Sequence, residues 1–93
     1  MNSIRHQIEF DSIIFMENKT YVSYCPELDV SSCGYTIEEA RKNLQTAVKL
    51  FLEESEKMGT LEAILEESGY KKKKSGQWTA PRIMATEVMA VGV

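Results

Sequence analysis

Hydrophobic and polar residues alternate near the start of the chain. Over residues 4–10 the even positions carry three apolar side chains and a histidine, and the odd positions are polar. This period of two indicates a half-buried β-strand, and residues 13–15 either extend it or follow a bulge that changes its face. The polar break "MENKT" contains Asn18, a residue suited to a left-handed turn position, and the aromatic, β-branched stretch "YVSYC" follows it. The pattern therefore predicts a β-hairpin that ends at Cys25.

A corner and a third strand come next. Pro26 ends the second strand because proline cannot donate to a ladder, and residues 27–29 form a tight corner before the short strand in "DVSSCGY". Gly34 permits the exit from this strand. Thr36 and Glu39 then form a capping box, in which a hydroxyl and a carboxylate satisfy backbone amides at a helix start.

The helix that begins after Thr36 carries one apolar stripe. Its apolar residues recur at intervals of three and four, which is typical of a helix with one face toward a core. These residues are Ile37, Ala40, Leu44, Ala47, Val48 and Phe51. Gly59 is expected to end this helix, and Thr60 is expected to cap a second, short helix that Gly69 closes.

The last part of the chain predicts a loop and a strand. Residues 71–77 are charged and lack an apolar period, so we expect a solvated loop. Residues 82–93 are apolar on both faces, as in a strand that is covered from two sides, by the helices and by a second subunit. The expected fold is α+β: a βββαβ order with a four-stranded sheet, covered on one face by the long helix and the short second helix. Its last strand returns parallel to the first.

Composition limits the domain count and the location. With 93 residues, of which 43% are hydrophobic, the chain has room for a single domain over residues 1–93. Such a small domain leaves much of its sheet exposed, so we expect a homodimer or a higher oligomer. The net charge of −3 gives no general attraction to nucleic acid or to membranes. No signal peptide or membrane span is evident, and a cytoplasmic location is expected.

Few residues offer chemistry. Cys25, Cys33 and His6 are too few for a closed zinc site, and His6 on the apolar side of its strand is better explained as a structural residue than as a base. Glu9 and Asp11 lie opposite that apolar side, where solvated surface is the simpler explanation than a nuclease centre. We therefore assign no catalytic, metal or cofactor site.

Two features remain as candidate binding elements. The run of lysines at residues 71–74 is the basic patch of the chain, and either solvates a loop or contacts RNA together with the aromatic residue nearby. Exposed aromatic side chains make good interface anchors, although ordinary sheet packing explains them equally well. The aromatic candidates for partner binding are Tyr21, Tyr24, Tyr35 and Trp78.

The stretch "YVSYCPELDVSSCGYTIEEARKNLQTAVKLFLEE", residues 21–54, resembles the HicB-like antitoxins. In that family a strand, a CPEL-type corner, a short strand and a glycine turn lead into Thr-x-Glu-Glu-Ala and a helix. The matching positions are Cys25, Pro26, Glu27, Leu28, Gly34, Thr36, Glu38, Glu39, Ala40, Asn43, Leu44, Ala47 and Leu50. The resemblance implies a partial RNase H-like fold that has lost its catalytic cluster.

The resemblance also implies a partner. HicB-like antitoxins inhibit HicA toxins, which are small RNA-cleaving proteins, by covering the active site. Many of them carry a C-terminal operator-binding domain. This chain ends at Val93 without one, and direct DNA binding is therefore doubtful. Tyr35 also departs from the acidic or polar residue expected before the capping threonine.

Three functional hypotheses follow. The first is a non-enzymatic antitoxin that masks an RNA-cleaving toxin. The second is a residual RNase H-like nuclease that uses Glu9 or Asp11 with a divalent ion. The third is an oligomeric module that binds a small ligand or nucleic acid.

The capping box makes a first prediction. Replacing Thr36 with Ala removes the hydroxyl that caps the long helix and should lower the free energy of unfolding by about 1 kcal/mol. A thermal melt measures this loss, and an unchanged melting curve would mean that the helix starts elsewhere.

Overall fold

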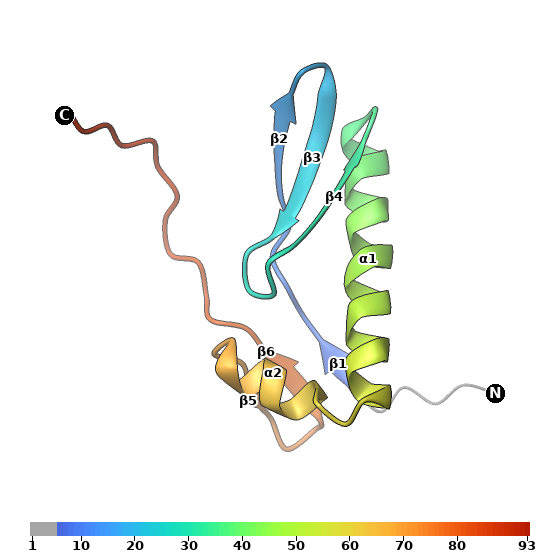
Figure 1. Cartoon of the computed structure of the whole chain (residues 1–93). Coiled ribbons are helices and arrows are strands. Elements are labelled where there is room, and N and C mark those ends of the chain that lie inside the picture. Colours follow the sequence, from blue (N-terminus) through green and yellow to red (C-terminus); the bar gives the residue numbers. More distant parts are fainter. Residues whose placement is uncertain (1–5) are drawn as a thin grey trace.

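The computed structural model describes residues 6–93, so the first two residues of the predicted strand at 4–10 lie outside the described part. Within it the chain is mixed α and β, with two helices and two three-stranded sheets (Figure 1). The helices are α1 (Ile37–Lys57) and α2 (Leu61–Glu67). The α+β class predicted from the sequence is thus confirmed.

The larger sheet is an antiparallel meander in the order β2-β3-β4. It consists of β2 (Ile13–Glu17), β3 (Thr20–Cys25) and β4 (Val30–Gly34). Asn18 and Lys19 connect β2 to β3 with φ angles of 52° and 59°. Two consecutive left-handed residues form the type of hairpin turn whose twist matches that of the flanking strands. The predicted hairpin and the left-handed Asn18 are both confirmed.

The corner between β3 and β4 is built by residues 26–29. β3 ends at Cys25, directly before Pro26, as the sequence predicts. Asp29 completes the turn with a φ of 56°, and its Oδ1 accepts a hydrogen bond of 2.9 Å from the Tyr24 hydroxyl. An aspartate tolerates this left-handed conformation better than most residues do.

Helix α1 packs along β3 and β4, as Figure 1 shows. Ala40, Leu44 and Val48 of the predicted stripe are buried, whereas Ile37 at its start is exposed. The capping box is present: Thr36 Oγ1 accepts from the Glu39 amide at 3.0 Å. The Glu39 carboxylate accepts in return from the Tyr35 amide, one residue before the cap, at 3.3 Å.

The helix ends follow the glycine pattern. Gly59 and Gly69 have φ angles of 74° and 87° directly after α1 and α2, a conformation that glycine adopts without steric cost. Thr60 precedes α2 but makes no capping hydrogen bond. Its hydroxyl lies 3.3 Å from the Ser55 carbonyl instead, so the expected cap at this position is wrong.

The smaller sheet has the order β1-β6-β5. Its strands are β1 (Gln7–Ile8), β5 (Lys71–Lys72) and β6 (Gln77–Thr79). The solvated loop expected over residues 71–77 is therefore wrong in part, because β5 and β6 pair antiparallel around a short turn. The sequence shows no apolar periodicity here because β5 consists of two exposed lysines. This short strand is held by backbone hydrogen bonds and not by buried side chains.

The prediction of one four-stranded sheet, with residues 82–93 as its last strand, is wrong. The parallel return to the first strand exists, but β6 makes it beside β1, and residues 82–93 form no strand. The reason lies at residues 9–12, which separate β1 from β2. The Glu27 carboxylate binds the Asp11 backbone amide there at 3.1 Å, so β1 and β2 join different sheets.

The core forms between the helices and the two sheets. Its buried members come from the CPEL corner, from both helices and from the segment around β6. They are Cys25, Leu28, Leu44, Val48, Leu61, Leu65, Tyr70 and Trp78. Since residues from 25 to 78 share one core, the two sheets are parts of a common packing unit.

The backbones of β4 and α1 approach each other closely at Gly34. A Cβ on Gly34 would lie 2.6 Å from the Ala40 amide nitrogen and 2.9 Å from the Glu39 carbonyl carbon. Backbone atoms cannot move aside as a flexible side chain can. The glycine therefore lets the end of β4 lie directly against the first turn of α1.

We predict that Gly34→Ala lowers the free energy of unfolding by about 1–3 kcal/mol, because the added methyl group forces β4 and α1 apart. Chemical denaturation measures the loss. Gly92→Ala is the matched control, since a Cβ there meets nothing within 4 Å. Equal stability of the two variants would contradict the close approach.

Candidate functional site

The CPEL corner, residues 25–28, has a structural role at every position. Cys25 and Leu28 are buried in the core, and Pro26 ends β3. Glu27 is half-buried and both of its carboxylate oxygens accept from the Asp11 amide, at 3.1 and 3.3 Å. The corner thus holds the segment that connects the two sheets.

The surroundings of the corner raise the pKa of Glu27. Burial raises the pKa of Glu27 above its usual value, and the hydrogen bond with the Asp11 carboxyl raises it further. Tyr70 reaches the same segment, where its hydroxyl donates to the Glu9 carbonyl at 2.7 Å. Burial, followed by the nearby Glu27 carboxylate, raises the pKa of Tyr70 as well. These groups act as hydrogen-bonding supports for residues 9–11.

The two cysteines differ in environment. Cys25 is fully buried, and burial raises the pKa of its thiol to about 11. Cys33 on β4 is exposed, and the chain has no disulfide. A thiolate nucleophile needs a lowered pKa, so the buried Cys25 thiol is unsuited to that chemistry.

The carboxylates do not gather into a metal-binding cluster. Within residues 6–93, no three His, Cys, Asp or Glu side chains lie close enough together to hold an ion. Glu9 accepts from the Ala80 amide at 3.3 Å, while Asp11 lies beside Glu27 rather than in open solvent as the strand alternation predicts. The break between β1 and β2 turns Asp11 toward the corner.

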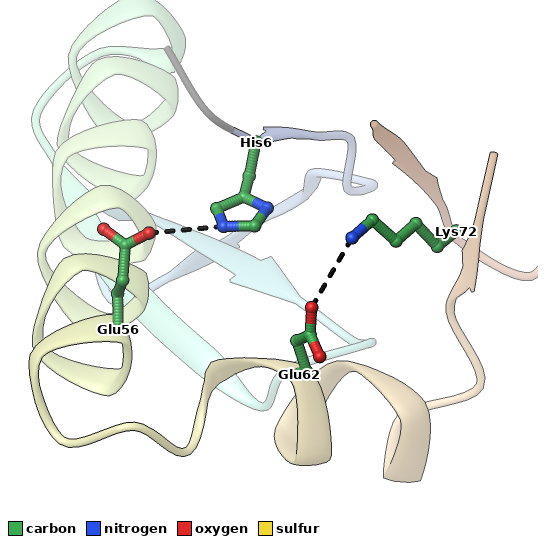
Figure 2. A network of polar contacts seen from close by, with 4 residues as sticks. All are labelled: His6, Glu56, Glu62 and Lys72. Carbon is green, nitrogen blue, oxygen red and sulfur yellow. Dashed lines mark hydrogen bonds and ion pairs between the residues drawn. The ribbon is translucent and has the colours of Figure 1, made fainter. Parts of the chain in front are cut away.

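Polar contacts tie the small sheet to the helices (Figure 2). His6 Nε2 lies 3.2 Å from Glu56 Oε2 of α1, and Lys72 Nζ lies 3.5 Å from Glu62 Oε1 of α2. Lys72 also lies over the Trp78 ring, 5.7 Å from its centroid. His6 therefore joins β1 to α1 and is half-buried, in keeping with a structural role.

Trp78 is not an exposed binding anchor. Only 2% of its surface is exposed, because it packs into the core from β6. A base cannot stack on a covered ring, so the pairing of the lysine run with an aromatic platform for RNA is also wrong. The sequence gives no sign of this burial, since a lone tryptophan after a charged segment fits either a loop or a strand.

The face of the larger sheet opposite α1 carries several apolar side chains. Ser23 faces α1 and donates to the Ala40 carbonyl at 2.7 Å, so its neighbours in β3 point the other way. Strand register places Phe15, Val22 and Cys33 in one row across that side, and Ile13 beside Tyr24 in the next. We call these five residues the open face.

The open face is accessible to a partner. Phe15 is 47% exposed, Cys33 is exposed, and the remaining members are at the edge of exposure or half-buried. Of the tyrosines expected at an interface, Tyr24 belongs to this face. Tyr21 lies on the α1 side and is half-buried, whereas Tyr35 precedes α1 and is 79% exposed. The three tyrosines predicted as interface anchors therefore do not share one surface.

Acidic side chains gather at the other end of the molecule. From the second half of α1 through α2, exposed glutamates outnumber the two lysines, Lys49 and Lys57. We call this group the glutamate ridge, and it comprises Glu53, Glu54, Glu56, Glu62, Glu66 and Glu67. Two members are engaged by His6 and Lys72, and the ridge favours a basic partner.

The sequence does not predict the role of several residues that support or form these surfaces. Ser23 and Tyr70 are buried polar residues whose partners, the Ala40 and Glu9 carbonyls, are distant in the sequence. Phe15 and Ile13 carry a usable signal: three consecutive apolar residues in a short edge strand place apolar groups on both faces, including the one that α1 leaves uncovered.

Comparison of the chain with known proteins identifies no relative. No family model, no curated protein and no solved structure matches the chain. Among residues 6–93, neither helix has the length and apolar character to span a membrane. The function is accordingly inferred from the surfaces of the chain itself.

The cysteine environments predict selective labelling. At pH 8 a thiol reagent should modify Cys33 in the folded protein and leave Cys25 unmodified, because Cys25 is buried and its thiol stays protonated. Mass spectrometry of peptides, with the urea-unfolded protein as control, measures the selectivity. Equal labelling of both cysteines in the folded state would contradict the buried corner.

Proposed function

We propose that this protein is a non-enzymatic antitoxin of the HicB type, which binds a small RNA-cleaving toxin of the HicA type and covers its active site. The observation that carries the proposal is the block at residues 21–54. Its CPEL corner, glycine exit and capped helix are the sequence features that resemble HicB-like antitoxins, and they form one packed unit.

The arrangement of elements supports the proposal. A meander of three strands, followed by a helix that packs on one side of it, is the beginning of an RNase H-like order. The two carboxylates considered for a nuclease are engaged otherwise: Glu9 accepts from the Ala80 amide, and the Asp11 carboxyl lies against Glu27. A binding role accounts for these residues better than metal-dependent cleavage does.

Two surfaces support a basic protein partner. The open face offers Phe15, Val22 and Tyr24 as apolar anchors, of the kind that form the centre of an interface. The glutamate ridge offers charges opposite in sign to those of a protein that grips RNA phosphates. Such complementarity speeds association and selects the partner.

Co-expression with a small RNA-cleaving toxin of the HicA type tests the proposal. The wild-type chain should restore growth that the toxin arrests, and the two proteins should co-purify. Phe15→Glu places a charge on the β2 side of the open face. We expect this variant to lose most of the rescue while remaining folded.

Leu50→Glu is the matched control, since Leu50 is 61% exposed on α1 and lies about half a turn away from the buried Val48. It should rescue growth as the wild-type chain does. Absence of rescue and of a complex with the wild-type chain would sink the antitoxin proposal. RNA cleavage by the purified chain with Mg²⁺, lost on Asp11→Asn, would favour a nuclease instead.

A further inference from the structure

The C-terminal tail, residues 81–93, is an apolar segment that has the composition of a strand but pairs with no other segment of the described part, residues 6–93. Every residue in it is exposed; Val88 is 100% exposed and Val91 is 87% exposed. Figure 1 shows the tail leaving the body after β6 and extending away from both helices. Exposure of apolar side chains on both faces of a segment is unfavourable in water, and such exposure marks a site of interaction.

The start of the tail is fixed to the body. Pro81 packs against Gly69, where a Cβ would lie 3.0 Å from the proline ring. Arg82 and Ile83 line an open depression together with Ile13, the first residue of β2. The tail therefore begins beside the N-terminal end of β2 and departs from there.

The larger sheet has one protected edge and one open edge. β4 lies against α1, and the Asn43 side chain donates to the Cys33 carbonyl of that edge strand at 2.8 Å. Among residues 6–93, β2 at the other edge is bonded on one side only, by β3. Met16 on its α1 side is still 60% exposed. An edge strand presents unpaired amides and carbonyls, and β2 accordingly has room for another strand.

We infer that the protein forms a homodimer by reciprocal strand exchange, in which the tail of each copy adds to the free β2 edge of the other. The chain itself supplies both halves of the contact, an unpaired apolar donor and an unpaired apolar edge. A two-fold arrangement uses each half once per copy, as a closed dimer requires.

The direction of the chain favours a second copy over folding back. Because the tail starts beside Ile13, within one chain it could only run parallel to β2. A tail from a second copy is free to run antiparallel, which is the more stable ladder per residue. That direction also places Arg82 of the donor near Glu17 at the far end of the accepting strand, where the charges are opposite.

Sedimentation of the full chain tests the exchange. The wild-type protein should sediment as a dimer, and M84D/T86D should sediment as a monomer with an unchanged circular dichroism spectrum, because both side chains are exposed, lie outside the core and fall opposite β2 in this register. Leu50→Asp is the control for a charge at another exposed apolar site, and should stay dimeric. A wild-type monomer, or an M84D/T86D dimer, would overturn the inference.

Cysteine pairing distinguishes exchange from folding back. In a Cys33→Ser background, Glu17→Cys combined with Arg82→Cys should oxidise to a covalent dimer. Within one chain these positions lie at opposite ends of β2, roughly 13 Å apart by strand rise, beyond disulfide reach. A monomer with an internal disulfide, or no disulfide at all, would contradict exchange. The toxin plays no part in either experiment, so the outcome is independent of the proposed function.

Discussion

The close approach of β4 to the first turn of α1 is the constraint on which the rest of the structure depends. Gly34 lets the two backbones meet, and the Ser23 hydroxyl on the neighbouring strand binds the Ala40 carbonyl in the same place. With the helix fixed there, Leu44 and Val48 lie over the sheet and close the core. The side of the sheet that α1 cannot reach becomes the open face.

The residues that first suggest chemistry build this architecture. Cys25 fills the core, and burial keeps its thiol protonated. Glu27 satisfies a backbone amide of the segment between the two sheets, at some cost that its raised pKa reflects. The strand-to-helix motif is therefore a scaffold. The surfaces that can recognise a partner are the open face, the glutamate ridge and the β2 edge. None of them is formed by the side chains that the motif buries in the core.

The local elements of the fold follow from the sequence, whereas the assembly of distant segments does not. The β2–β3 hairpin, the corner at Pro26, the cap at Thr36 and the end of α1 at Gly59 each depend on short-range chemistry, and each is present. The fate of Trp78 depends instead on which strand β6 meets, a choice made by packing across the molecule. The same holds for the C-terminal tail. Its apolar pattern predicts a strand that is covered on both faces, but it does not predict which molecule supplies the covering surface.

The central claim, that this chain acts by masking an RNA-cleaving partner, is tested most directly by RNA cleavage in vitro. The partner protein is mixed with increasing amounts of the purified chain and the cleavage rate is measured. The account predicts that cleavage stops near one antitoxin chain per toxin chain. Undiminished cleavage at a large excess of the chain would contradict it.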